Sequence, residues 1–200
     1  YVMDFEKVPE TRTPGAWVNT MAKFAIVKMP DGSKVLRKRN DNASPIVARA
    51  NAYISDPDLK DYTVEADVYG TKVRDKDMPD MGVGACRYSL ILIGNDKELR
   101  LVTWDAQKRI EKKLAYPWKP GVWYRMKLMA TVEGNKGIIK GKVWPREEKE
   151  PAEWMIEAED PIPNKEGAAL IYGFANGTIN AENPGAEIFY DNVKITPNKK

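Results

Sequence analysis

The sequence contains no histidine and only one cysteine among its 200 residues. Without histidine, the chain lacks the usual base of serine and cysteine nucleophile systems and the commonest ligand of zinc and copper. A bound metal would therefore have to be a hard cation held by carboxylate and carbonyl oxygens. The lone cysteine, Cys86, cannot form an internal disulfide, and its strand-like surroundings predict a small buried side chain rather than a reactive thiol.

The chain also lacks a large excess of charge and any long apolar run. Its 32 basic and 29 acidic residues leave a formal net charge of +3, so we expect no nucleic-acid partner unless a basic patch forms locally. No stretch approaches the ~20 apolar residues of a membrane span, so we expect no membrane insertion. The chain begins at Tyr1 without an initiator methionine or a leader-like segment, which we interpret as a mature chain or an excised C-terminal domain of a longer protein.

Alternation of apolar and polar residues recurs along the chain, whereas helical periodicity is hard to find. In the segment Tyr62–Tyr69, tyrosine, valine and alanine alternate with threonine, glutamate and aspartate. Other segments of this kind are Phe24–Met29, Ile46–Ile54, Tyr88–Ile93, Leu99–Trp104, Trp123–Val132, Ile138–Trp144 and Ala168–Phe174. Roughly a dozen short strands separated by turn sequences predict one all-β domain over residues 1–200, an antiparallel two-sheet β-sandwich of the jelly-roll type.

Two hairpins and three irregular loops complete this prediction. Gly94-Asn95-Asp96 and Gly134-Asn135-Lys136-Gly137 are turn sequences that each join two strand-like segments. The segments expected to be irregular are Arg74–Met81, Pro161–Gly167 and Asn176–Gly185. The basic segment Lys34–Arg39 is typical of an edge strand protected from aggregation by charge, with attraction of a polyanion as the alternative.

Acidic residues lie near both ends of the chain. Asp191 interrupts the last strand-like segment, and Glu6, with Asp4 as a second choice, lies in the first. An acidic pair of this kind ties the two ends of many jelly-roll sandwiches together through calcium, which takes six or more oxygen ligands. We predict a structural Ca²⁺ held by Glu6 and Asp191, backbone carbonyls and water. The alternative is that Asp191-Asn192 forms a bulge or turn and that Glu6 is a solvated end.

One face of a predicted sheet would be rich in aromatic and charged side chains. If Tyr124 and Met126 point inward, their neighbours point outward, together with outward residues of the partner strands. Aromatic rings stack on the apolar faces of sugars, and polar groups bind the hydroxyls. The candidate ligand-binding residues are Trp104 and Trp144 first, then Trp123, Arg125, Lys142, Arg87 and Tyr69. Alternatively, Glu65 and Asp67 form ordinary cross-strand ion pairs with Arg87 and Arg125, each worth ~0.2–1 kcal/mol.

Four segments that occur in order carry a resemblance to a known group of domains: Trp123–Leu128, Gly141–Pro145, Glu150–Trp154 and Tyr190–Lys194. Together they resemble the concanavalin A-like or laminin-G-like sandwich domains of bacterial secreted proteins. The chain is especially similar to the domain that follows pyrroloquinoline-quinone-type β-propellers. The resemblance implies a jelly roll, export to the periplasm, cell surface or medium, and a role connected with glycans.

The same resemblance includes laminarinase-type glycoside hydrolases. Their catalytic motif fits Glu65 and Asp67, but Gly70 stands where the second catalytic acid is needed. Because retaining glycosidases need two carboxyl groups ~5–5.5 Å apart, we predict that the chain is not catalytic. An enzyme would have to combine Glu65 or Asp67 with Asp105 or Glu111 from another strand.

The sequence therefore predicts a monomeric, non-catalytic carbohydrate-binding module that recognises a polysaccharide or a cell-surface glycan. Two alternatives remain open, a glycoside hydrolase of laminarinase-like fold and a protein-interaction or adhesion domain.

Overall fold

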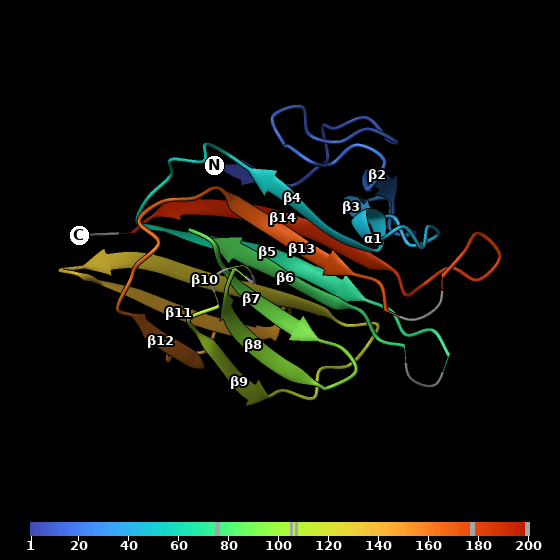
Figure 1. The fold of residues 1–200 in the computed structure, drawn as a ribbon. Helices are drawn as coiled ribbons and strands as arrows, with labels where there is room; N and C mark the ends of the chain where they lie inside the picture. Colours follow the sequence, from blue (N-terminus) through green and yellow to red (C-terminus); the bar gives the residue numbers. More distant parts are fainter. Residues whose placement is uncertain (75–76, 105, 107, 177–178, 199–200) are drawn as a thin grey trace.

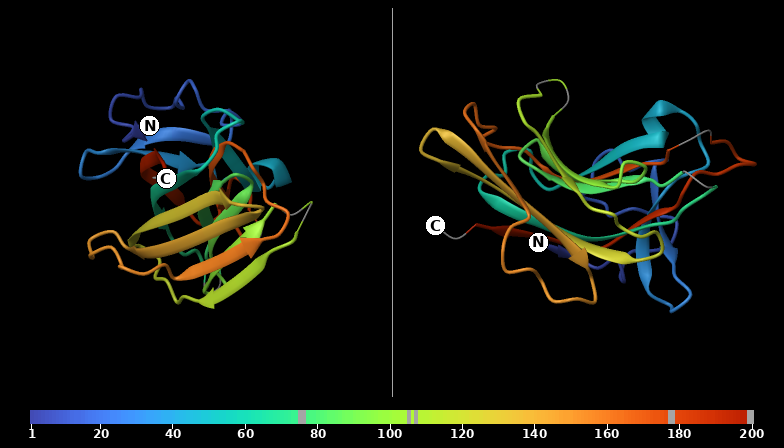
Figure 2. Two further views of the ribbon diagram at one scale, coloured as in Figure 1. Left: turned by 90° about the vertical axis from the view of Figure 1, so that its left-hand side faces the viewer. Right: turned by 90° about the horizontal axis from the view of Figure 1, so that it is seen from below.

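The computed structural model describes residues 1–74, 77–104, 106, 108–176 and 179–198, and nearly all of its regular structure is β-strand (Figure 1). The strands form two antiparallel sheets packed face to face, as the two views in Figure 2, from one end and from below, also show. The predicted all-β jelly-roll sandwich is confirmed. No helix in the described part of the chain is long and apolar enough to cross a membrane.

The larger sheet has eight strands in the described residues: β1 (Val2–Met3), β2 (Phe24–Lys28), β3 (Lys34–Lys38), β5 (Tyr62–Gly70), β10 (Trp123–Glu133), β11 (Lys136–Pro145), β12 (Ile156–Asp160) and β14 (Ile188–Pro197). Their order is β12-β11-β10-β5-β14-β3-β2, with β1 paired to β14. The second sheet has six strands: β4 (Arg49–Ile54), β6 (Asp80–Ala85), β7 (Tyr88–Ile93), β8 (Glu98–Thr103), β9 (Glu111–Ala115) and β13 (Ala169–Phe174). Their order is β4-β13-β6-β7-β8-β9.

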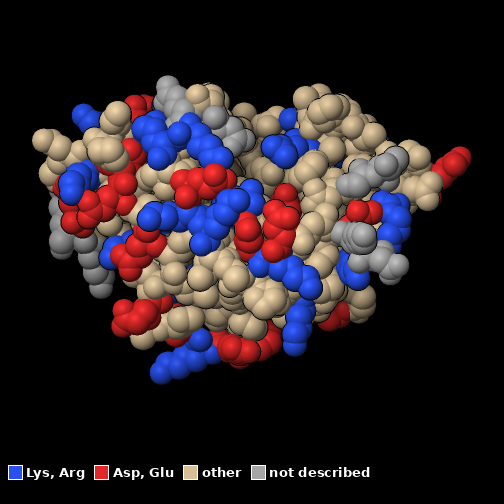
Figure 3. All heavy atoms as spheres, turned by 60° about the horizontal axis from the view of Figure 1, so that its bottom comes forward, with Lys and Arg blue, Asp and Glu red and all other residues tan. Residues whose placement is uncertain are grey.

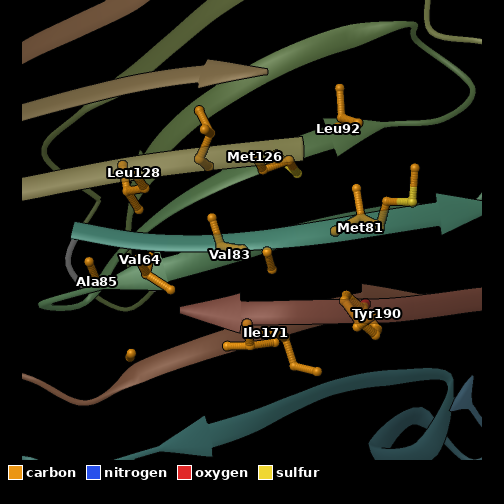
Figure 4. Close-up of a cluster of buried hydrophobic side chains, with 14 of the residues drawn as sticks. Val64, Met81, Val83, Ala85, Leu92, Met126, Leu128, Ile171 and Tyr190 are labelled. Atoms are coloured by element: carbon orange, nitrogen blue, oxygen red, sulfur yellow. The ribbon is translucent and has the colours of Figure 1, made fainter. Parts of the chain in front are cut away.

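The core lies between the two sheets and follows the alternation seen in the sequence. Val64 of β5 and Leu128 of β10 come from the eight-stranded sheet and are fully buried. Val83 of β6 and Leu92 of β7 approach them from the six-stranded sheet (Figure 4). Since burying an aliphatic side chain of this size contributes ~1.5–3 kcal/mol, this layer supplies most of the driving force for pairing the sheets.

Several local predictions can be compared with the structure. The predicted hairpins are present as β7–β8 and β10–β11. The predicted strand Ile46–Ile54 is wrong in its first residues, because Pro45 favours the first turn of the short helix α1 (Pro45–Ala48), and β4 begins only at Arg49. The predicted loop Arg74–Met81 is too long by two residues, since β6 begins at Asp80.

Cys86 is buried, as predicted. Its side chain lies in the core cluster and is 2% exposed. Burial raises the pKa of the thiol to about 11, so the neutral form dominates at physiological pH. The residue therefore acts as a small core side chain.

The basic segment Lys34–Arg39 does not form an edge strand, so that prediction is wrong. Strand β3 lies inside the sheet between β14 and β2, and β2 takes the edge position. Lys38 is only 1% exposed, and its Nζ donates to the backbone carbonyls of Arg39 at 2.9 Å and Val47 at 2.8 Å. This lysine therefore ties β3 to α1 from inside the protein.

A buried carboxylate closes the sandwich on the side of β12. Asp160 is fully buried, and its Oδ2 accepts hydrogen bonds from Tyr88 Oη and Arg109 Nη2, each at 2.8 Å. Tyr88 belongs to the six-stranded sheet and Asp160 to the eight-stranded one, so this cluster links the two layers directly.

We expect Asp160→Asn to lower the free energy of unfolding by about 2–4 kcal/mol, because it leaves a cationic and a hydroxyl donor without their anionic acceptor. Urea unfolding measures the change. The neighbouring Glu159→Gln is the control: Glu159 is exposed and pairs with the equally exposed Lys136, so its loss should be below about 1 kcal/mol. Equal losses in the two variants would contradict the role given to Asp160.

Lys38 should make stability depend on pH in the alkaline range. Burial lowers the pKa of its amine to about 8, so between about pH 8 and 10 the unfolded chain binds more protons than the folded protein. The free energy of unfolding should therefore rise with pH in the wild type relative to Lys38→Met. Urea unfolding from pH 7 to 10 tests this, with the exposed Lys60→Met as the control that should run parallel to the wild type. Tyrosines also begin to titrate in this pH range. Their effect on the free energy of unfolding is the same in all three proteins, so it cancels when the proteins are compared.

Candidate functional site

The outer face of the six-stranded sheet is hollowed into a groove of about 480 Å³. Figure 2 (right) shows this sheet bowed, with α1 rising at one end of its outer face. Residues from β4, β13, β6, β7, β8 and β9 all line the groove. It therefore crosses the whole width of the sheet.

Strand register explains which side chains meet in the groove. Cross-strand pairing places Asn51, Tyr172, Gly82, Ile91 and Arg100 in one row, across β4, β13, β6, β7 and β8. Side chains in such a row point to the same face, opposite to the core residues that alternate with them. The floor of the groove is thus apolar at its centre and polar at both ends.

Strand β6 adds no side chain to the groove floor at two positions, because both are glycines. A Cβ on Gly82 would lie 2.2 Å from the carbonyl oxygen of Leu90. This clash is with backbone, so no side-chain rotation could remove it. A Cβ on Gly84 would lie 2.7 Å from Leu170, whose side chain covers this position. The middle of the groove is therefore formed by side chains from the strands on either side of β6, such as Tyr172 and Ile91.

Trp104 stands at the edge of the groove and is 57% exposed. Its backbone N–H donates to the carbonyl of Arg87 at 3.0 Å, which fixes it beside the turn between β6 and β7. A second hollow of about 330 Å³ adjoins it and shares Trp104, Ser89 and Asn51 with the groove. Trp104 thus lies between two connected depressions and offers a ring to both.

Two buried polar atoms in the groove have no partner within the described residues. They are Asn51 Oδ1, an acceptor, and Arg100 Nε, a donor, at opposite ends of the floor row. An unpaired buried polar group costs about 1–3 kcal/mol, so such atoms are rare and call for an explanation. A ligand or water with both donors and acceptors would satisfy them.

The described residues that line the groove include two carboxylates, Asp80 and Glu111. Burial raises the pKa of Asp80, while its Oδ1 accepts from Gly94 N–H at 2.9 Å and from the Asn176 amide at 3.2 Å. The hydrogen bond from Lys108, at 2.7 Å, lowers the pKa of Glu111. Three strand spacings of ~4.8 Å separate β6 from β9, so the two carboxylates are about 14 Å apart or more.

The structure divides the predicted binding residues between the two sheets. Arg87 and Trp104 border the groove, whereas Tyr69, Trp123, Arg125, Lys142 and Trp144 lie on the outer face of the eight-stranded sheet. The prediction that they share one face is wrong, because alternation shows which residues point outward but not to which sheet a strand belongs. Long-range pairing decides the sheet.

The outer face of the eight-stranded sheet is filled by its own side chains. Trp144 is 5% exposed, and Lys142 Nζ lies 4.8 Å from the ring centroid of Trp154 and 2.7 Å from the carbonyl oxygen of Pro151. The guanidinium of Arg146 covers the ring of Trp123, 4.8 Å from its centroid. These rings have cationic partners from the same chain.

The two residues of the partial catalytic motif are also engaged by neighbours on that face. Asp67 is fully buried, with its two oxygens 2.7 and 2.9 Å from Nε and Nη2 of Arg125. The amide of Asn192 adds a third hydrogen bond at 2.8 Å, and Glu65 pairs with Lys127 at 3.2 Å. The predicted ion pair of Asp67 with Arg125 is confirmed. Neither carboxylate faces the groove.

The other acids named for an enzyme lie elsewhere. Glu111 lines the groove on β9, on the sheet opposite to Glu65 and Asp67. Asp105 lies outside the described residues.

The acidic residues near the two ends of the chain lie close enough to influence each other. Burial, and then the negative charges of Asp67 and Glu6, raise the pKa of Asp191 to about 6. Glu6 Oε1 accepts from Lys34 N–H at 3.0 Å, and Asp4 Oδ1 accepts from Glu6 N–H at 3.2 Å. The predicted bulge is present, with the register shifting between Asp191 and Lys194.

This donor set is chemically compatible with a hard cation. Two carboxylates with backbone carbonyls can hold calcium when water completes the shell, and a cation would remove the repulsion between Glu6 and Asp191. In the described part of the chain, no three acidic or cysteine side chains gather as a metal-binding group. The protein would therefore supply few of the ligands through side chains.

Charge on the remaining surface is mixed. On the face that Figure 3 shows, lysine and arginine side chains are interspersed with aspartate and glutamate rather than gathered by sign. Lys136–Glu159 and Lys140–Glu157 are pairs of this kind between β11 and β12. The Lys136–Glu159 pair is exposed and the Lys140–Glu157 pair is partly exposed, so each contributes little to stability.

The groove contains residues that the sequence did not single out, namely Arg49, Asn51, Asp80 and Tyr172. One signal was present in the alternating glycines of Gly82-Val83-Gly84, because glycine inside a strand often marks a close approach to another backbone or a ligand. Arg49, Asn51 and Tyr53 also alternate along β4. Their shared face becomes visible only once β4 is paired with β13.

No family model matches the chain, and no curated protein matches it significantly in sequence. Solved structures do match over the full length. One comes from a study of endo-acting O-glycanases that members of the human gut microbiota express to initiate mucin breakdown; it has a TM-score of 0.64 and 9% identity, with 100% of this chain and 99% of that chain covered.

Two further matches have similar coverage. The Emp47p carbohydrate recognition domain gives a TM-score of 0.61 at 13% identity, covering 100% of this chain and 96% of that one. A family 16 glycosyl hydrolase from Mycobacterium smegmatis gives 0.57 at 13% identity, covering 98% and 99%. The fold is a concanavalin A-like jelly roll. At these identities the likeness extends to the fold alone, and the predicted link to propeller-containing proteins stays a prediction.

Proposed function

We propose that this jelly roll is a non-catalytic carbohydrate-binding module whose ligand lies in the groove over the six-stranded sheet. The observation that carries the proposal is Trp104, a large exposed ring placed between two connected hollows. Stacking on the CH face of a sugar would cover this ring. The unpaired Asn51 Oδ1 and Arg100 Nε would meet sugar hydroxyls and ring oxygens.

The shape of the groove supports a polymer as ligand. It crosses the sheet from β4 to β9, which is five strand spacings or about 24 Å. A groove that is open along its length suits an extended chain of sugars better than a small compact metabolite. A polysaccharide or cell-surface glycan outside the cell is therefore the ligand class that we propose, bound by a monomeric secreted or surface-attached module.

Acid placement argues against glycoside hydrolysis as the function. Retaining enzymes hold two carboxyl groups ~5–5.5 Å apart and inverting enzymes ~6.5–9.5 Å, whereas Asp80 and Glu111 are about 14 Å apart or more. Glu65 and Asp67 are ion-paired on the opposite side of the sandwich. A binding role needs no such pair.

The structural comparisons support a glycan ligand without identifying it. Similar chains are described as a carbohydrate recognition domain, a glycosyl hydrolase and a protein from work on O-glycanases. Each of these descriptions refers to the recognition or the cleavage of sugars. The shared fold makes the same ligand class a reasonable proposal for this chain.

We also propose a structural calcium ion between the first and last segments of the chain, held by Glu6 and Asp191. The raised pKa of Asp191, caused by burial and by nearby negative charge, supports this proposal. When bound, calcium would supply charge balance for these carboxylates. Asp191 lies on β14 of the eight-stranded sheet, away from the groove, so the role of the ion would be stability rather than ligand contact.

We expect Trp104→Ala to weaken polysaccharide binding about tenfold or more, because it removes the exposed stacking surface. A gel-retardation screen over polysaccharides identifies a ligand, and calorimetry then measures the affinity of the variant. Trp123→Ala is the matched control, since this tryptophan lies on the other sheet; it should keep the wild-type affinity.

Assays for new reducing ends on the same samples separate a module from an enzyme. Binding without product supports the module, and product release would overturn it in favour of a hydrolase. Failure of the folded protein to bind any glycan would also overturn the proposal and favour a protein partner. Loss of binding in Trp123→Ala but not in Trp104→Ala would move the site to the eight-stranded sheet.

Calcium should raise the melting temperature of the wild type relative to chelator. At calcium 100-fold above Kd the gain is about 2.7 kcal/mol, or about 5–10 °C for a domain of this size. Asp191→Asn should abolish most of this shift, whereas Asp58→Asn, at an exposed turn, should retain it. Equal melting temperatures with calcium and chelator in the wild type would contradict the site.

A further inference from the structure

The groove carries a local excess of positive charge that the protein as a whole lacks. Its described lining contains four basic side chains and two acidic ones: Lys23, Arg49, Arg100, Lys108, Asp80 and Glu111. Over the whole chain, 32 basic residues are nearly balanced by 29 acidic ones. The excess is therefore a property of the groove and not of the general surface.

Two of these cations, Arg49 and Lys23, form no direct salt bridge among the described residues, although Asp80 attracts Arg49 from a distance. The guanidinium carbon of Arg49 lies 4.6 Å from the ring centroid of Phe174, so the group is stacked on an aromatic face. Lys23 Nζ donates to the side-chain oxygen of Asn19, which is neutral. Stacking holds the planar guanidinium in one orientation, which reduces the entropy lost when it binds an anion.

Arg100 lies toward the other end of the floor row and is only partly engaged. Its Nη2 contacts Glu98 at 2.8 Å and Asp96 at 3.3 Å. Its Nε is buried and has no partner in the described structure. This leaves one donor of a charged group unsatisfied inside the groove, where a hydrogen bond to an anion is stronger than one to a neutral acceptor.

The two groove carboxylates cancel only part of this charge. Glu111 forms a salt bridge with Lys108 at 2.7 Å. Asp80 accepts hydrogen bonds from Gly94 N–H and the Asn176 amide, and it lies across Phe174 from Arg49, so it attracts Arg49 without forming a direct salt bridge. Four basic side chains face two acidic ones, so a net positive charge remains, and Arg49 and Lys23 lie near the α1 end of the groove, whose residue Ile46 also lines it.

From this arrangement we infer that the groove binds an anionic polysaccharide, one whose sugars carry carboxylate or sulfate groups. Arg49 and Lys23 hold the anionic substituent, while Trp104 stacks on a sugar ring. This inference rests on the proposed carbohydrate-binding function and narrows its ligand class. A guanidinium binds carboxylate or sulfate through two parallel N–H donors, whereas a neutral hydroxyl uses only one.

The test measures the affinity of the full chain for five polymers: dextran, carboxymethyl-dextran, dextran sulfate, polygalacturonate and laminarin. We expect at least one anionic polymer to bind about tenfold tighter than both neutral ones at 150 mM salt. Carboxymethyl-dextran and polygalacturonate report a preference for carboxylate, and dextran sulfate reports a preference for sulfate. Dextran is the uncharged control on the same backbone.

Variants locate the interaction. Arg49→Gln and Lys23→Gln should each weaken anionic binding about fivefold to tenfold. Lys136→Gln removes the same charge from an exposed residue on β11, far from the groove, and should change the affinity less than about twofold. Melting curves of each variant establish that the fold is retained.

Three other results would contradict the anionic preference, the location of the site or the binding function. If neutral and anionic polymers bind equally, the anionic preference is wrong and the carbohydrate-binding function stands. If Lys136→Gln loses as much affinity as Arg49→Gln, the attraction is general electrostatics and the inferred site is wrong. If none of the five polymers and no glycan of the wider screen binds, the proposed function fails together with the inference.

Discussion

The apolar layer between the two sheets is the constraint on which the rest of the structure depends. Each strand alternates its side chains, so committing one set to this layer commits the other set to an outer face. Val64, Leu128, Val83 and Leu92 show the inner set at the centre of the sandwich. Once they are buried, the alternating side chains of the same strands must point to the outer face of their sheet. On the six-stranded sheet, this is the face that carries the groove.

Buried charged groups strengthen the margins of this layer. Asp160 joins the sheets near β12, Asp67 joins β5 to β10 and β14 on one face, and Lys38 joins β3 to α1. Each has hydrogen-bond partners that replace water, which is the condition under which a buried charge is tolerated. Their partners are all internal, whereas Arg49 in the groove is stacked on Phe174 and forms no direct salt bridge within the described residues.

Much of the fold could be predicted from local pattern, because alternation in segments such as Tyr62–Tyr69 reports directly on strand and burial. Turn residues likewise located the β7–β8 and β10–β11 hairpins. The site was harder to predict because its residues converge through pairings distant in sequence, such as Asn51 with Tyr172 and Tyr172 with Gly82.

The same limitation explains the specific errors. Trp104 and Trp144 both follow a strand-like apolar stretch, yet Trp104 is exposed beside a groove, whereas Trp144 is buried with Lys142 Nζ 5.9 Å from its ring centroid. Nothing within a few residues of either distinguishes them. The prediction that Lys34–Arg39 forms an edge strand failed for a related reason. Strand β14, which pairs with β3, comes from the far end of the chain.

The two glycines of the groove floor have a consequence for how such a protein can diversify. A Cβ at Gly82 would meet the backbone of Leu90 and one at Gly84 would meet Leu170, so neither position can take a side chain unless a neighbour moves. Exposed residues that line the groove, such as Trp104 and Arg49, have no such restriction, so they can change with little penalty to folding. One scaffold could in this way acquire new ligand preferences by substitutions at a few rim positions while its interior stays the same.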